Sequence, residues 1–180
     1  MVYIFLANGF EEIEALTQVD YLRRAGIEIE TVGIESDCIF GAHNIPVICD
    51  IEVADIRLDD NLEMIILPGG LGGVDGISGS PEAMRAVDHC VKNGIYVAAI
   101  CAAPTILAKK GLLSGKHAVC YPAMLEELSE CSDTSGRIAV DGKFITAAAA
   151  GVSEEFSFAL IEALRGKEAA EKVRESIVAR

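Results

Sequence analysis

Short apolar runs typical of buried strands alternate along the chain with longer segments in which apolar residues recur at helical spacing. The predicted strands are residues 2–7, 27–33, 63–68, 95–100 and 116–121, and two predicted hairpins cover residues 38–53 and 137–148. The predicted helices are residues 11–25, 81–93, 103–110, 154–165 and 167–176. This alternation indicates an α/β fold with a mostly parallel sheet and helices on both faces.

Local signals mark several boundaries of these elements. Ser80 and Pro81 suit the N-cap and the first turn of the helix that begins there. Ser153 is expected to cap the helix that follows it. The glycine-rich segment 69–73 is expected to be a flexible loop, and it lacks the G-K-[ST] ending of a phosphate loop. With 180 residues and neither a linker nor a repeat, the chain is expected to form one domain over residues 1–180.

The run from Tyr96 to Pro104 carries the clearest chemical signal in the chain. It predicts a buried strand that stops at Cys101 and is followed at once by a helix. A thiol in that position faces unpaired N–H groups and the positive end of the helix dipole, which can lower its pKa from about 8.5. The same strand–nucleophile–helix turn is typical of hydrolases. The alternative is a buried structural cysteine at the end of a core strand.

Parallel sheets bind ligands at the carboxyl ends of their strands. Residues 8–14 follow the first predicted strand, residues 69–73 follow a central strand, and Cys101 follows the strand expected beside it. These three features are therefore expected to meet at one edge of the sheet.

Several segments in one unbroken order resemble the ThiJ/PfpI superfamily, the group of DJ-one-like proteins. The segments are Gly9–Glu14, Val19–Gly26, Leu67–Gly70, Ala98–Thr105 and Glu154–Ala159. The resemblance implies a flavodoxin-like three-layer sandwich, usually assembled as a homodimer. It also implies that Cys101 occupies a strained nucleophile elbow and that Glu14 is the carboxylic acid touching its sulfur.

The position of Glu14 agrees with that role. A carboxyl group partly withdrawn from water beside a thiolate has its pKa raised by burial and by the neighbouring charge. It can then donate a hydrogen bond to sulfur or shuttle a proton. The alternative is a solvated glutamate at a helix start, where the dipole favours it. Glu11 and Glu12 are expected to be of that solvated kind.

The glycines at 69 and 70 are candidates for binding a negatively charged oxygen. Their N–H groups, with that of Ala102, could form an oxyanion hole for an alkoxide or a sulfinate. The alternative is an ordinary loop in which Gly69 and Gly70 only provide positive φ angles.

The chain departs from the superfamily pattern at its histidines. Some members carry a histidine after the elbow cysteine or before the proline of a later strand, and these positions hold Ala102 and Tyr121 here. A phenol with a pKa near 10 is a poor base at neutral pH, which argues against cysteine peptidase chemistry. Arg24 matches an arginine near the dimer seam that adds positive potential beside Cys101. Cys120 is either a resolving thiol or a core residue.

Composition excludes several classes of partner. The net charge of −13 argues against binding to nucleic acid or to an anionic membrane surface. The six cysteines show no C-x-x-C or zinc spacing and the three histidines are scattered, so neither a metal nor a cofactor is predicted. No apolar run is long enough to span a bilayer, and reduced thiols in the cytoplasm are the expectation.

Two functions are compatible with these residues. The first is a cofactor-free glyoxalase or deglycase that binds a small aldehyde such as methylglyoxal as a hemithioacetal on Cys101, with Glu14 as the proton shuttle. The second is a non-enzymatic oxidative-stress sensor or chaperone that works by oxidation of Cys101 to sulfinate. Both functions depend on one activated sulfur.

Overall fold

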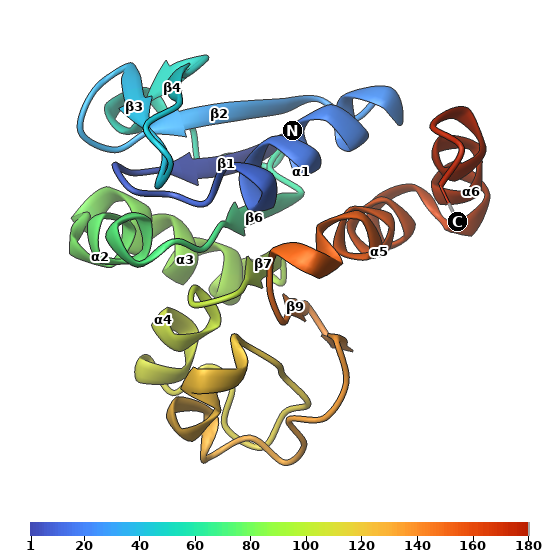
Figure 1. Cartoon of the computed structure of the whole chain (residues 1–180). Helices are drawn as coiled ribbons and strands as arrows, with labels where there is room; N and C mark the ends of the chain where they lie inside the picture. Colours follow the sequence, from blue (N-terminus) through green and yellow to red (C-terminus); the bar gives the residue numbers. More distant parts are fainter. Residues whose placement is uncertain (180) are drawn as a thin grey trace.

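The computed structural model describes residues 1–179, which fold around a seven-stranded sheet with the order β5-β2-β1-β6-β7-β9-β8 (Figure 1). The strands are β1 (Val2–Leu6), β2 (Ile29–Gly33), β5 (Ile51–Glu52), β6 (Met64–Leu67), β7 (Tyr96–Ile100), β8 (Ile138–Asp141) and β9 (Phe144–Ala147). Neighbouring strands are parallel except for the antiparallel pair β8–β9. The inner order β2-β1-β6-β7-β9 is that of flavodoxin-like folds, which confirms the predicted fold class.

Helices cover both faces of this sheet (Figure 1). One face packs against α1 (Glu12–Arg24), α5 (Ser153–Arg165) and α6 (Lys167–Ser176), and the other against α2 (Leu71–Gly79), α3 (Pro81–Asn93) and α4 (Pro104–Lys109). Side chains alternate along each strand, so Ile4 of β1 lies in the core between the sheet and α1, α5 and α6, and Phe5 lies in the core between the sheet and α2, α3 and α4. Such a sheet needs strands that are apolar on both sides, as the sequence shows. Among residues 1–179, no helix has the length and apolar character to cross a membrane.

The hairpin predicted at 38–53 forms a small sheet of its own, with β3 (Cys38–Phe40) antiparallel to β4 (Pro46–Ile48). It lies against the segment that joins β1 to α1. The Gly9 N–H donates to the carbonyl of Phe40 at 2.7 Å, and the Ala42 N–H donates to the carbonyl of Phe10 at 2.7 Å. The turn of the hairpin is therefore held next to the first turn of α1. The 3-10 turn η1 (Val53–Asp55) follows β5.

The prediction of a flexible loop at 69–73 is wrong, because α2 begins at Leu71. Its glycines instead allow a close approach between two backbones. A Cβ atom at Gly73 would lie 2.7 Å from the Cα atom of Phe10, and one at Gly72 would lie 2.8 Å from the carbonyl oxygen of Asn8. Any side chain at these positions would push α2 away from the segment after β1.

The strand predicted at 116–121 is also wrong, because this segment contributes only an isolated bridge between His117 and Asp133. The edge of β9 pairs with β8, so the segment does not pair with β9. Its backbone N–H groups find hydrogen-bond acceptors outside a strand pairing. The Val119 N–H, for example, donates to Oγ1 of Thr146 at 2.9 Å. Directly after it, Pro122 begins the 3-10 helix η2 (Pro122–Leu128).

The two predicted serine caps have different outcomes. Ser80 caps α3 as expected, since its Oγ accepts the N–H of Ala83 at 3.2 Å. Ser153 does not cap α5: it is the first residue of the helix, after the 3-10 turn η3 (Ala150–Val152), and its buried hydroxyl has no hydrogen-bond partner among residues 1–179. Its carbonyl oxygen instead accepts Nε2 of Gln18 from α1 at 3.3 Å. A contact between helices thus replaces the predicted cap.

Candidate active site

Cys101 lies at the turn between β7, which ends at Ile100, and α4, which begins at Pro104. Its φ angle is 63°, in the left-handed region that residues other than glycine rarely adopt. Two hydrogen bonds hold this strained backbone: the Cys101 N–H donates to Ala147 at 2.9 Å, and the Cys101 carbonyl accepts the Tyr121 N–H at 2.7 Å. The predicted elbow is confirmed, and Cys101 is only partly buried.

Glu14 reaches the same place from the first turn of α1. Its side chain is buried, with 1% of the residue exposed, and its carboxyl group is hydrogen-bonded to the Cys101 thiol. Oε2 of Glu14 also accepts the N–H of Gly69 at 3.0 Å. Burial, reinforced by the charge of Glu11, raises the pKa of Glu14 to about 7. A carboxyl group with this pKa can either accept or give up a proton near neutral pH.

The pKa of the Cys101 thiol is not lowered, contrary to the expectation from its place before a helix. Burial is the largest cause, and the charge and hydrogen bond of Glu14 add to it, raising the pKa to about 12. The N–H groups of Ala102 and Gly70 act in the opposite direction, because they donate to the sulfur. Local position favours the thiolate, but burial, together with the carboxylate brought in by α1, outweighs it. The sulfur therefore needs Glu14 as a base to become a nucleophile.

The two glycines after β6 play different parts. The N–H of Gly69 is used by Glu14, so it is not directed at the sulfur. A Cβ atom at Gly69 would meet the Glu14 carboxylate and would lie 2.6 Å from the Cβ atom of Cys101. Gly70 has a φ of +85°, and its N–H faces the sulfur together with that of Ala102. Gly69 thus leaves room for the acid–thiol contact, and Gly70 uses its positive φ to present a donor.

A pocket of about 380 Å³ opens over the sulfur. Its lining residues are Glu11, Gly70, Leu71, Cys101, Ala102, Tyr121, Ala123 and Met124. The sequence-predicted residues Gly70, Ala102 and Tyr121 are therefore brought together with Cys101. Leu71 and Met124 were not anticipated, because a leucine in a glycine-rich segment and a methionine after a proline carry no sign of their shared location.

Two further sequence candidates lie outside this pocket. Arg24 is the last residue of α1, where its Nε donates to Asp20 at 2.8 Å, and it lines a separate groove with Arg165. Within one chain it does not face Cys101. Cys120 is buried, and its thiol donates to the carbonyl of Tyr121 at 3.4 Å. It belongs to the hydrophobic core on the α2, α3 and α4 side of the sheet and is absent from the pocket lining.

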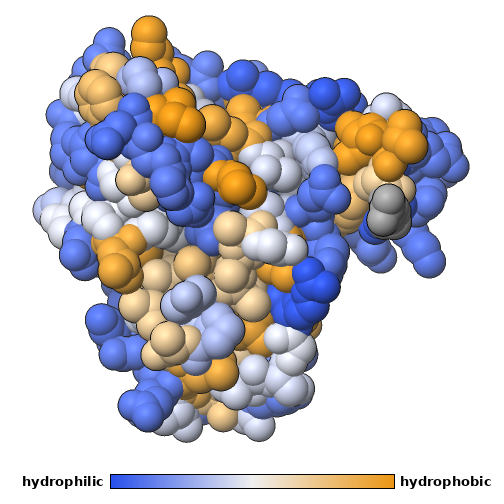
Figure 2. Space-filling model, in the orientation of Figure 1, coloured by the Kyte–Doolittle hydropathy of each residue, from blue (hydrophilic) through white to orange (hydrophobic). Residues whose placement is uncertain are grey.

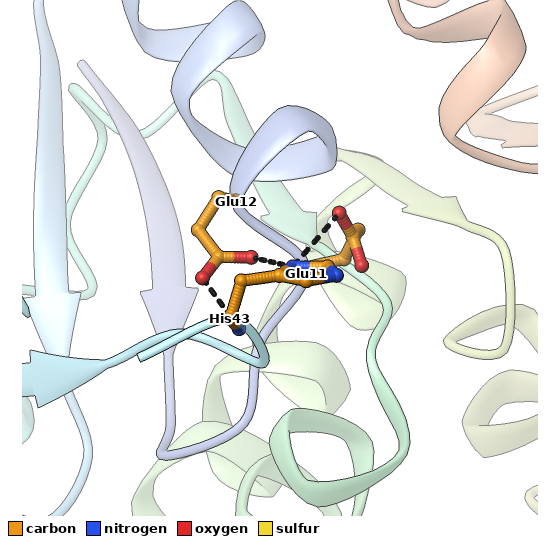
Figure 3. Close-up of side chains that lie close together, drawn as sticks. All are labelled: Glu11, Glu12 and His43. Atoms are coloured by element: carbon orange, nitrogen blue, oxygen red, sulfur yellow. Dashed lines mark hydrogen bonds and ion pairs between the residues drawn. The ribbon is translucent and has the colours of Figure 1, made fainter. Parts of the chain in front are cut away.

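Glu12 is not the solvated side chain that the sequence suggested (Figure 3). It is buried, and its two carboxylate oxygens accept the backbone N–H of His43 at 2.8 Å and bond its ring Nδ1 at 2.7 Å. This contact lowers the pKa of Glu12, against the effect of its burial, and raises that of His43. Glu11 lies near the same ring, with its carboxylate 3.9 Å from Nδ1. Glu12 thus ties the hairpin turn to α1, while Glu11 borders the pocket.

A strained cysteine at the carboxyl edge of a flavodoxin-like sheet, with a buried glutamate against its sulfur, defines a class of elbow-cysteine proteins. The model of the DJ-1/PfpI family matches residues 1–163, and the chain belongs to this family. The family and the fold expected from the sequence are thereby confirmed.

Individual relatives are similar along most of the chain. Protein DJ-1 homolog B of Arabidopsis thaliana is 36% identical over 99% of this chain, which spans 41% of that protein's length. The crystal structure of Drosophila melanogaster DJ-1beta superposes with a TM-score of 0.94 at 32% identity, covering 99% of this chain and 97% of that one. The Caenorhabditis elegans protein named Glutathione-independent glyoxalase DJR-1.2 is 26% identical over 88% of this chain and 84% of its own length.

Proposed function

We propose that this protein is a cofactor-free glyoxalase that converts small 2-oxoaldehydes such as methylglyoxal into hydroxy acids. The observation that carries the proposal is the contact between the buried carboxyl group of Glu14 and Cys101, a residue that lines an open pocket. The glyoxalase name of the Caenorhabditis elegans relative supports the same chemistry.

The first step joins the sulfur to the aldehyde. The Glu14 carboxylate takes the thiol proton while Sγ of Cys101 bonds to the aldehyde carbon, and the C=O electron pair moves to oxygen. Glu14 then returns the proton to that oxygen, which completes a hemithioacetal and restores the carboxylate. Because its pKa is about 7, Glu14 is sufficiently ionised near neutral pH to act as this base.

The second step moves a proton between two substrate carbons. Glu14 removes the proton from the former aldehyde carbon, giving an enediolate, and delivers it to the neighbouring carbon, while the hydroxyl proton on the first carbon's oxygen moves to the oxygen of the second carbon. The product is a thioester in which one carbon is oxidised and the other is reduced, so no external oxidant is needed. Water then cleaves the thioester, which releases lactate from methylglyoxal and restores the Cys101 thiol. Early glycation adducts release their aldehyde reversibly, so the same site would also act as a deglycase.

Lactate formation by the purified chain tests this proposal. We expect turnover that is abolished in Cys101→Ala and reduced about 10²–10⁴-fold in Glu14→Gln, with Cys120→Ala as a matched control that keeps activity. In D₂O the lactate should carry deuterium at C2, since the proton passes through an exchangeable carboxyl group. Equal lactate formation by the wild type and Cys101→Ala would refute the proposal.

A second candidate function is an oxidation sensor. It is favoured by the N–H groups of Gly70 and Ala102, which point at the sulfur and would also hold the oxygens of a sulfinate. One peroxide molecule oxidises the Cys101 thiol to sulfenic acid with release of water, and a second oxidises it to sulfinic acid. After mild peroxide treatment, peptide mass spectrometry should show two added oxygens on Cys101 alone. Equal oxidation of all six cysteines would exclude this role.

We further propose that the protein acts as a homodimer. Ile13 on the first turn of α1 and Ile48 at the end of β4 are 55% and 78% exposed, and Ile45 in the hairpin turn is also exposed. Figure 2 shows apolar surface over the hairpin, at the top of the view, among mostly hydrophilic residues. Light scattering should give twice the chain mass of 19.1 kDa, and Ile48→Asp should give a monomer. A monomeric wild type at micromolar concentration would contradict this proposal.

A further inference from the structure

We propose that the pocket over Cys101 selects neutral aldehydes that carry an apolar group, and that Leu71 and Tyr121 form the wall that binds this group. The inference rests on the proposed function, whose substrate class it narrows. It concerns the part of the substrate that does not react.

The first support is the exposure of two large apolar side chains beside the nucleophile. Leu71 is 66% exposed at the first position of α2, and Tyr121 is 45% exposed just before η2. Both line the pocket, together with Met124 and two alanines. Apolar surface left in water around a reactive group is typical of a ligand site, because a ligand can cover it.

The second support is the charge of the pocket. Within the described part of the chain, none of the lining residues is a lysine, an arginine or a histidine. Glu11 lines the pocket and the buried Glu14 contacts Cys101, so within one chain an anionic substrate meets acidic groups and no compensating cation among the lining residues. The chain's own Arg24 is paired with Asp20 and lines a different groove. A carboxylate or phosphate on the substrate is therefore disfavoured.

The third support is that both wall residues are fixed relative to the sulfur. The Tyr121 N–H donates to the carbonyl of Cys101 at 2.7 Å, which anchors the backbone that carries the phenol ring. Leu71 directly follows Gly70, whose N–H donates to Sγ. A group bound to the aldehyde carbon on Cys101 would thus meet a wall that the elbow itself holds in place.

Turnover gives the first arm of the test. We expect kcat/KM for phenylglyoxal to exceed that for methylglyoxal by about tenfold. Leu71→Ala and Tyr121→Ala should each remove most of this preference, mainly through KM for phenylglyoxal, and Tyr121→Phe should keep it. Val140→Ala, a change of an exposed apolar residue on β8 away from the pocket, is the matched control.

Alkylation of Cys101 gives a second arm that needs no turnover. Rate constants for iodoacetate, iodoacetamide and N-phenyliodoacetamide are measured by mass spectrometry and divided by those for glutathione. We expect the normalised rate constant to be largest for N-phenyliodoacetamide, intermediate for iodoacetamide and smallest for iodoacetate. The advantage of N-phenyliodoacetamide should be lost in Leu71→Ala and Tyr121→Ala. If neither aldehyde is turned over but this order of rate constants holds, the proposed glyoxalase function is refuted and the assignment of Leu71 and Tyr121 as an apolar wall is supported. If iodoacetate reacts as fast as the phenyl amide, or the variants change nothing, the pocket assignment is overturned even in an active enzyme.

Discussion

The carboxyl group of Glu14 and the thiol of Cys101 share one proton over a wide range of pH. Burial raises the pKa of Glu14 to about 7, and burial together with the Glu14 charge raises that of Cys101 to about 12. Between these values the pair carries a single negative charge, which titrates as a property of both groups. The reactive form needs that charge on the sulfur and the proton on Glu14. The reactivity of Cys101 is therefore a property of the pair.

The pH dependence of Cys101 alkylation should report this shared proton. In the wild type we expect the rate to rise with an apparent pKa near 7, where the pair loses its first proton. Glu14→Gln removes the group that ionises near pH 7 and also the charge that raises the thiol pKa, so the rise near pH 7 should be lost and a single rise should follow at higher pH, where the buried thiol itself ionises. Iodoacetamide labelling followed by mass spectrometry measures the pH profile of the wild type and that of Glu14→Gln. Superimposable profiles would show that the two groups are independent.

Glu14 should also make the fold less stable at high pH. Its folded pKa of about 7 lies above the ordinary value of 4.5, so its contribution is fully present below pH 4.5 and is lost as the pH rises through 7. The shift corresponds to a loss of at most about 3 kcal/mol. Urea unfolding at pH 5 and pH 8 should show a larger decrease for the wild type than for Glu14→Gln. An equal decrease in both proteins would argue against a buried carboxylate at this site.

Gly69→Ala should separate Glu14 from Cys101. The added Cβ atom would meet the Glu14 carboxylate and would lie 2.6 Å from Cβ of Cys101, so one of the two side chains has to move. We expect the alkylation rate of Cys101 at pH 7 to fall at least tenfold and the free energy of unfolding to fall by about 1–3 kcal/mol. Gly79→Ala is the matched control, because a Cβ atom there has nothing within 4 Å. Unchanged reactivity in Gly69→Ala would contradict the close packing of this turn.

Glu12→Ala should loosen the hairpin without removing the reactive pair. Glu12 accepts the backbone N–H of His43 and bonds its ring, and its loss leaves these groups without the partner that ties the turn to α1. We expect a decrease of about 1–3 kcal/mol in the free energy of unfolding. Amide hydrogen exchange should rise in residues 41–45, while Glu30→Ala, a change of a half-buried glutamate on β2, leaves these amides protected. Unchanged exchange at these amides in Glu12→Ala would show that the contact does not hold the turn.

Much of the fold was predictable because its signals are local. The apolar runs give the strands of the central sheet, Ser80 caps its helix, and the abrupt end of the strand before Cys101 marks the elbow. Where a local signal competes with a distant partner, prediction fails. Residues 116–121 have the composition of a strand, but β8 already pairs with the edge of β9. The glycines after Gly70 suggest flexibility, but they fit a helix closely against Phe10.

The sequence by itself determined that a cysteine would stand at the carboxyl edge of a parallel sheet, because strand ends and helix starts are encoded by neighbouring residues. Only the tertiary structure decided how that cysteine behaves. Burial and a carboxylate from α1 raise its pKa, the amide that faces it comes from Gly70, and the wall above it includes Leu71 and Met124. Electrostatic and apolar interactions depend on distances between atoms, and folding sets these distances between segments that are far apart in the chain.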